Sequence, residues 1–299
     1  MLFGLSLSVE VCAGSGVGLL VRSGHRTEQL EWSMTSFVRH GCRLATVTSL
    51  LAAVLSVGIA TSVQAGTVLI TGANRGIGLE FVRHYADAGY TVIATARNPS
   101  TADDLNTLAV ANKDIHVEEL DVNDFAEIDD LAEKYQGTAI DVLVNNAGIT
   151  GRPERQRFGT IDYGTFESVM TTNVQGPLKI TEAFTSHVAD SDEKKVAVVT
   201  SSEGSIAGAT SNRQPFYRAS KAAVNMIMRN ISHTLKDQGI VVVLVNPGPV
   251  DTDMMARARG RMPLRTTILA VDEMVAVIDN ATLNDTATFY NFDGTVLPW

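Results

Sequence analysis

Residues 71–78 read Thr71-Gly72-Ala73-Asn74-Arg75-Gly76-Ile77-Gly78, and they follow directly on the apolar run Thr67-Val68-Leu69-Ile70. A segment with helical spacing of apolar residues then extends from Gly76 to Ala88, so the glycines lie between a strand and a helix. In such a turn Gly72 permits the tight bend, Gly76 lets the main chain approach an anion, and Gly78 allows close helix–strand packing. The segment predicts a dinucleotide-binding unit.

Further apolar runs follow at regular intervals. They are residues 91–95, 116–120, 141–145, 196–200, 240–245 and 288–292. Continuous apolar runs are typical of strands buried on both faces, and parallel neighbours need helical crossovers between them. The pattern predicts a doubly wound, Rossmann-like α/β fold with about seven parallel strands and helices on both faces. No linker or internal repeat interrupts residues 66–299, which we expect to form a single domain.

Composition excludes several classes of partner and site. The net charge of -9 argues against a nucleic-acid or anionic-membrane partner, because such binding needs a positive surface. The two cysteines, Cys12 and Cys42, both precede residue 66, so the rest of the chain has no thiol. The six histidines form no pair at helical ligand spacing, and we predict no metal site.

Residues 1–65 differ from the rest and are interpreted as a leader. Basic residues at Arg39 and Arg43 precede the apolar run 44–60, and small residues Val63 and Ala65 close it. These are the parts of a secretory signal peptide with cleavage after Ala65, and Met34 would be its functional start. The alternative is an uncleaved membrane anchor at 44–60. Cleavage predicts a periplasmic or secreted protein without stable membrane association; retention predicts a cytoplasmic or membrane-anchored one.

The form of the nicotinamide cofactor is predicted from charge at the end of the second strand. An acidic residue there would bind the free ribose hydroxyls of NAD, but the chain reads Thr95-Ala96-Arg97-Asn98. Arg97 and Arg75 could instead bind a 2′-phosphate, which favours NADP(H). The alternative is that both arginines are solvated surface charges.

Tyr217 and Lys221 are four residues apart, so on a helix both side chains project from one face. A tyrosine is a weak acid at neutral pH, and a neighbouring ammonium would lower its pKa by favouring the phenolate. The pair is therefore a candidate for proton transfer.

These motifs together resemble the short-chain dehydrogenase/reductase family. Its fingerprint has the glycine spacing of residues 72–78, and further matches are Asn145-Asn146-Ala147-Gly148, Pro247-Gly248 and Tyr217-Arg218-Ala219-Ser220-Lys221. The last motif and the ending Phe289-Tyr290-Asn291 to Pro298-Trp299 are most similar to the sniffer and C-factor type of carbonyl reductases. That branch often has a tryptophan after the proline–glycine pair, where this chain has Pro249.

The resemblance implies a catalytic set and a set of cofactor contacts. Tyr217 would be the proton donor, Lys221 would tune it, Ser202 rather than Ser201 would bind the substrate oxygen, and Asn173 would hold a water linked to the lysine. Beyond Gly72, Asn74, Arg75, Gly76, Ile77, Gly78 and Arg97, the implied cofactor contacts are Asp121, Val122, Asn145, Ala147, Gly148, Tyr217, Lys221, Pro247, Gly248, Val250 and Thr252.

The predicted function is NADPH-dependent reduction of an aldehyde or ketone to an alcohol, with a small-molecule carbonyl or alcohol as substrate. The alternative is a catalytically silent NADP-binding regulatory protein of the same fold. The family also implies a homo-oligomer. Residues 254–267 carry four arginines and predict a lid, whose charges either attract an anionic substrate or are simply solvated.

Overall fold

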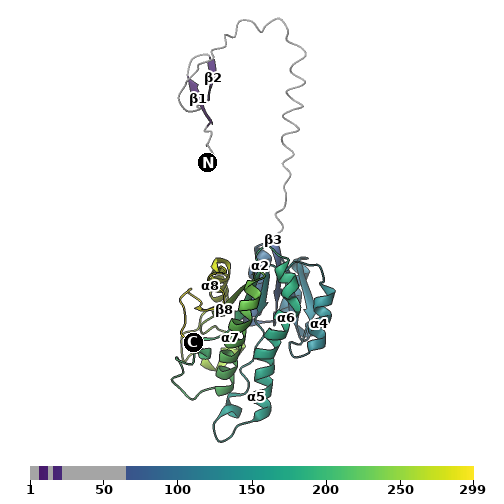
Figure 1. The fold of residues 1–299 in the computed structure, drawn as a ribbon, viewed down its shortest axis with the longest axis vertical. Coiled ribbons are helices and arrows are strands. Elements are labelled where there is room, and N and C mark those ends of the chain that lie inside the picture. The colour runs from purple at the N-terminus through teal and green to yellow at the C-terminus, as the bar shows by residue number, and fades with distance from the viewer. Residues whose placement is uncertain (1–6, 13–15, 22–64) are drawn as a thin grey trace. The chain divides into compact units, whose positions relative to one another are not determined.

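The computed structural model describes residues 7–12, 16–21 and 65–299, and the chain divides into the units Met1–Ser62 and Val63–Trp299 (Figure 1). In the first unit β1 (Leu7–Cys12) pairs antiparallel with β2 (Gly16–Val21). Met34 and the apolar run 44–60 lie outside the described residues, so the leader stays a prediction. Across the part of the chain that is described, no helix is long and apolar enough to cross a membrane.

The second unit is built on seven strands, all parallel, in the order β5-β4-β3-β6-β7-β8-β9. The strands are β3 (Ala65–Ile70), β4 (Tyr90–Ala96), β5 (Ile115–Glu119), β6 (Val142–Asn145), β7 (Lys195–Val199), β8 (Val241–Asn246) and β9 (Thr288–Asn291). Each overlaps one of the predicted apolar runs. The order reverses between β3 and β6, which makes the sheet doubly wound and confirms the predicted fold.

Seven helices accompany the sheet, and they divide between its two faces (Figure 1). They are α2 (Gly76–Asp87), α3 (Asp103–Ala111), α4 (Phe125–Lys134), α5 (Tyr163–Met170), α6 (Gly176–Ala189), α7 (Pro215–Lys236) and α8 (Thr267–Asn280). One core packs α2, α3 and α8 against the sheet, and the other packs α4, α6 and α7. Neighbouring strand residues serve opposite cores: Val68 and Ile70 lie in the first, Leu69 in the second.

A buried carboxylate holds the start of the sheet together. Asp141, directly before β6, accepts the main-chain amide of Thr67 in β3 at 2.7 Å. Its second oxygen accepts the amides of Asp192 and Glu193, before β7, at 3.3 and 3.5 Å. A Cβ on Gly66 would lie 2.1 Å from this carboxylate, so the glycine is needed for the approach. Asp141 therefore connects the beginnings of three neighbouring strands.

Replacing Asp141 by alanine leaves three amides without their acceptor, so we expect a loss of about 2–3 kcal/mol in the free energy of unfolding. Urea denaturation measures it. Asp130→Ala, which removes an exposed carboxylate on α4, is the matched control and should lose nothing. Equal stability of the two variants would contradict this role of Asp141.

Candidate active site

A cavity of about 850 Å³ lies at the carboxyl ends of the strands. Residues that follow successive strands line it, among them Gly72 after β3, Arg97 after β4, Asn146 after β6, Thr200 after β7 and Pro247 after β8. The cavity includes the ends of β3 and β6, where the strand order reverses, and open α/β sheets bind ligands at such a point. The fold thus brings residues distant in sequence to one site.

Most of the predicted cofactor contacts reach this cavity. The predicted residues on its wall are Gly72, Asn74, Arg75, Gly76, Ile77, Gly78, Arg97, Val122, Ala147, Gly148, Tyr217, Lys221, Pro247 and Thr252. Residues on the wall that sequence reasoning missed include Leu120, Asn123, Asn146, Ile149 and Thr150. Leu120 ends a predicted strand and the other four lie within five residues after one, and that position is the signal that could have found them.

The glycine loop is shaped to receive an anionic group. Gly72 has a φ of +66°, and a Cβ on Gly78 would lie 2.2 Å from the main-chain oxygen of Gly72. Helix α2 has no side-chain cap at its N-terminus, so the first amides of its 12 residues are available to a ligand. These observations fit the pyrophosphate of a dinucleotide.

Asn145, a predicted cofactor contact, does not line the cavity, whereas its neighbour Asn146 does. Asn145 was the expected cofactor contact, but it is buried and its side chain donates to Thr181 in α6 at 3.1 Å. The side-chain amide of Asn146 instead donates to the main-chain oxygens of Thr71 and Gly72 at 2.9 and 3.2 Å. Successive side chains at the end of a strand point to opposite faces, so only one of the two asparagines faces the cavity.

Three other predicted contacts do not line the cavity. The carboxylate of Asp121 turns back to accept the main-chain and side-chain amides of Asn123, at 2.9 and 2.8 Å. Val250 is buried. Gly248 has a φ of +72°, and a Cβ there would lie 2.9 Å from the ring of Phe292, so its glycine serves packing against the end of the sheet. The flanking residues Val122, Pro247 and Thr252 form the wall instead.

Tyr217 and Lys221 lie together in the first turns of α7. The Lys221 ammonium is 5.9 Å from the centroid of the Tyr217 ring and donates to the main-chain oxygen of Val199 at 2.8 Å. Lys221 is buried, and its desolvation lowers its pKa to about 8. The predicted pairing of these two residues is therefore present in the structure.

Asn173 links the lysine-bearing helix to the end of β6. It lies in a π-helical turn, Thr171–Gln175, between α5 and α6. Its side chain accepts from the amide of Ile149 at 2.8 Å and donates to the Ile149 oxygen at 2.8 Å and to Ser220 at 2.9 Å. A Cβ on Gly148 would lie 3.3 Å from Asn173 Oδ1 and 3.7 Å from Lys221 Nζ, so the three residues converge.

The pKa of Tyr217 is raised, whereas we expected Lys221 to lower it. Burial is the largest cause; a side-chain hydrogen bond with Ser201 opposes it, and the nearby Glu203 carboxylate adds to it. The expectation failed because desolvation of the phenolate dominates, while the Lys221 ammonium donates its hydrogen bond to the Val199 oxygen and not to the phenol. Tyr217 is therefore held as the neutral phenol at neutral pH.

Ser201, not the predicted Ser202, lies at the Tyr217 hydroxyl. The main chain is still extended at Ser201, with φ -159° and ψ 146°, and turns into a 3₁₀ helix, Ser202–Gly204, one residue later. That turn leaves Ser202 exposed, with its main-chain amide donating to Asn246 at 2.9 Å. The assignment of Ser202 is corrected, since motif spacing alone does not show where the extended chain ends.

The arginines of the predicted lid are largely paired. Arg257 lies 3.5 Å from Glu154, Arg259 lies 2.6 Å from Asp251, and Arg265 pairs with Glu273. The carboxylates neutralise their charge locally, which favours the interpretation that they are ordinary surface charges rather than a site for an anionic substrate. Arg75 of the glycine loop also pairs with a lid residue, Asp253, at 3.1 Å.

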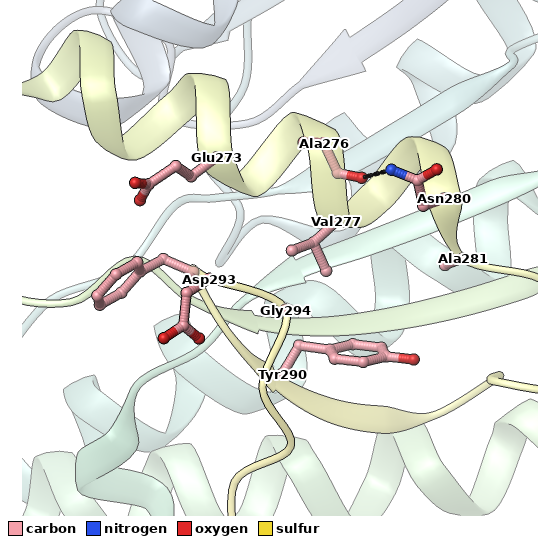
Figure 2. Close-up of a pocket in the computed structure, with 9 residues that line it drawn as sticks. Glu273, Ala276, Val277, Asn280, Ala281, Tyr290, Asp293 and Gly294 are labelled. Atoms are coloured by element: carbon pink, nitrogen blue, oxygen red, sulfur yellow. Dashed lines mark hydrogen bonds between the residues drawn. The ribbon is translucent and has the colours of Figure 1, made fainter.

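A second cavity, of about 350 Å³, lies between α8 and the end of β9 with the residues that follow it (Figure 2). It is lined by Glu273, Ala276, Val277, Asn280, Ala281, Tyr290, Phe292, Asp293 and Gly294. None of the predicted site residues is among them. Residues 65–299 and the hairpin contain no cluster of three histidine, cysteine, aspartate or glutamate side chains suited to a metal ion.

Comparison with known proteins establishes the class. The short chain dehydrogenase family model matches residues 66–262, and the chain belongs to that family of oxidoreductases. C-signal of Myxococcus xanthus is 36% identical over 160 residues, which cover 54% of this chain and 93% of that protein.

Two solved carbonyl reductases are similar over more than three quarters of the chain. Carbonyl reductase Sniffer of D. melanogaster has 28% identity and a TM-score of 0.72, covering 78% of this chain and 99% of that one. The NADPH-bound carbonyl reductase from chicken fatty liver has 31% identity and a TM-score of 0.72, covering 79% and 100%. The resemblance to the sniffer and C-factor type is thus confirmed.

The lowered pKa of Lys221 has a measurable consequence for stability. Between the folded value of about 8 and the unfolded value of about 10.4, the unfolded chain binds more protons, so stability rises with pH. From about pH 7 to about pH 10 we expect the wild type to gain about 2 kcal/mol relative to Lys221→Met, as measured by urea denaturation. A difference independent of pH would show that Lys221 titrates normally.

Proposed function

We propose that the protein is an NADPH-dependent carbonyl reductase that converts an aldehyde or ketone to an alcohol. The observation that carries this proposal is the position of the Tyr217 phenol, which lines the same cavity as the glycine loop and lies near Ser201. A hydride acceptor bound there would lie between a dinucleotide site and a proton donor. The reductases that it resembles, including one with NADPH bound, support the choice of reaction.

The mechanism assigns a separate task to each side chain. Bound NADPH would supply the hydride that adds to the carbonyl carbon. Tyr217 donates its phenolic proton to the carbonyl oxygen, and the raised pKa of the phenol keeps that proton in place at neutral pH. Ser201 donates a hydrogen bond to the same oxygen as negative charge develops on it. Solvent then returns a proton to the phenolate, which replaces the proton given to the alcohol.

Lys221 and Asn173 would support this chemistry. The Lys221 ammonium stabilises the phenolate that forms when Tyr217 gives up its proton. Asn173 fixes the loop after β6 to α7 through Ile149 and Ser220, which keeps the wall of the cavity at a fixed distance from the lysine. A water linking Asn173 to Lys221 belongs to this proposal as well.

NADP(H) rather than NAD(H) fits the charge at the end of β4. Arg97 and Arg75 both line the cavity, and the turn after β4 offers no carboxylate to the ribose hydroxyls. Arg75 is 69% exposed and pairs with the equally exposed Asp253, an interaction weak enough for a phosphate to displace. An NADP-bound dehydrogenase from Burkholderia multivorans among the similar structures supports this choice.

The central test is the loss of NADPH absorbance with a panel of aldehydes, ketones and diketones. We expect turnover by the wild type and a fall of roughly a hundredfold or more for Tyr217→Phe, with NADPH binding retained. NADPH binding by the wild type without turnover of any substrate would favour a silent regulatory protein instead.

The two adjacent serines provide a matched pair of variants. Because Ser201 lies at the Tyr217 hydroxyl and Ser202 is exposed, Ser201→Ala should lower kcat roughly a hundredfold while Ser202→Ala changes it little. Steady-state kinetics on one substrate measure both. The opposite order would restore the assignment of Ser202.

Reversing the charge at Arg97 tests the cofactor preference. Arg97→Asp removes a partner of the 2′-phosphate and supplies one for the ribose hydroxyls, so the ratio of kcat/KM for NADPH over NADH should fall by roughly tenfold or more. Arg157→Asp makes the same change at an exposed residue outside the cavity wall and serves as the control. An unchanged ratio in Arg97→Asp would leave Arg97 without a role in cofactor choice.

A further inference from the structure

Helix α7, which carries Tyr217, does not cap its own N-terminus. Its N-cap residue Gln214 makes no side-chain capping bond and has a φ of 48°, and the first helical residue, Pro215, has no amide hydrogen. The first amides that need an acceptor are therefore those of Phe216 and Tyr217 itself.

Gln156, sixty residues earlier in the chain, supplies that acceptor. Its Oε1 accepts the main-chain amide of Phe216 at 3.1 Å and that of Tyr217 at 3.4 Å. Its Nε2 donates to the main-chain oxygen of Thr150 at 2.7 Å. Gln156 is 1% exposed, so it is a buried polar side chain whose hydrogen bonds all go to the main chain of two segments.

The segments that Gln156 joins are both part of the candidate site. Thr150 lines the cavity two residues after Gly148, and Tyr217 lines it from α7. The chain between them is tight, because a Cβ on Gly151 would lie 3.0 Å from Nε2 of Gln156 and 2.7 Å from Val169. A change at Gln156 therefore shifts the phenol relative to the wall formed by the loop after β6.

We propose that Gln156 is a positioning residue that sets the place of the Tyr217 phenol by capping α7 from the loop after β6. This inference rests on the proposed reductase function. Gln156 acts through the main chain of Phe216, Tyr217 and Thr150. An amide suits the task because it accepts at the helix N-terminus and donates to Thr150 at the same time.

The test compares Gln156→Met with Gln214→Met in the full-length protein. Both replace a glutamine near the start of α7 by a side chain of similar length, but only the first removes capping bonds. We expect Gln156→Met to lower kcat for carbonyl reduction by roughly tenfold or more, because small misplacements of a catalytic group are costly. The Kd for NADPH should stay within about twofold, and Gln214→Met should match the wild type.

Equal kcat in the wild type and Gln156→Met would overturn the proposal, as would a parallel loss of kcat and NADPH affinity.

Hydrogen exchange separates this proposal from the proposed function. The amides of Phe216 and Tyr217 should exchange faster in Gln156→Met than in Gln214→Met, whether or not the protein turns over a substrate. Unchanged exchange would show that the cap is not made. A wild type without turnover, together with faster exchange in Gln156→Met, would overturn the reductase and the positioning role while leaving the cap itself in place.

Discussion

The hydroxyl of Thr71 joins the two strands at which the order of the sheet reverses. It accepts the main-chain amides of Asn146 and Ala147, both at 3.0 Å. The side-chain amide of Asn146 in turn donates to the main-chain oxygen of Thr71 at 2.9 Å. These bonds hold the ends of β3 and β6 together where their connections leave in opposite directions. The glycine loop, the cavity and the residues opposite it all take their positions from this junction.

On the other side of the cavity, burial shifts the pKa values of Tyr217 and Lys221. Desolvation raises the pKa of Tyr217 and lowers that of Lys221 to about 8, so the two pKa values move apart and the lysine becomes the stronger acid of the pair. A neutral phenol beside a lysine that readily gains or loses its proton suits proton transfer near neutral pH. The same burial disfavours the charged lysine in the folded state, so the helix that carries both residues depends on its packing and its hydrogen bonds to neighbouring segments. The burial of Lys221 therefore lowers the stability of the fold while it suits proton transfer.

The sequence predicted the fold well because its signals are local. Apolar runs marked all seven strands, and the glycine spacing at residues 72–78 located the dinucleotide loop. The errors concern side-chain direction at strand ends. Ser201 and Ser202, like Asn145 and Asn146, are adjacent polar residues, and which one faces the site depends on where the extended chain turns. Gln156 carries no motif at all, because its partners lie sixty residues away along the chain.

The most direct test of the account is the transfer of deuterium from NADPH labelled at carbon 4 of the nicotinamide. With a carbonyl substrate, we expect one of the two stereochemical labels to appear on the carbinol carbon of the alcohol, seen as one added mass unit in the product. Wild-type protein should show this transfer and Tyr217→Phe should show almost none. Alcohol formed without the label from either side would contradict direct hydride transfer and, with it, the proposed function.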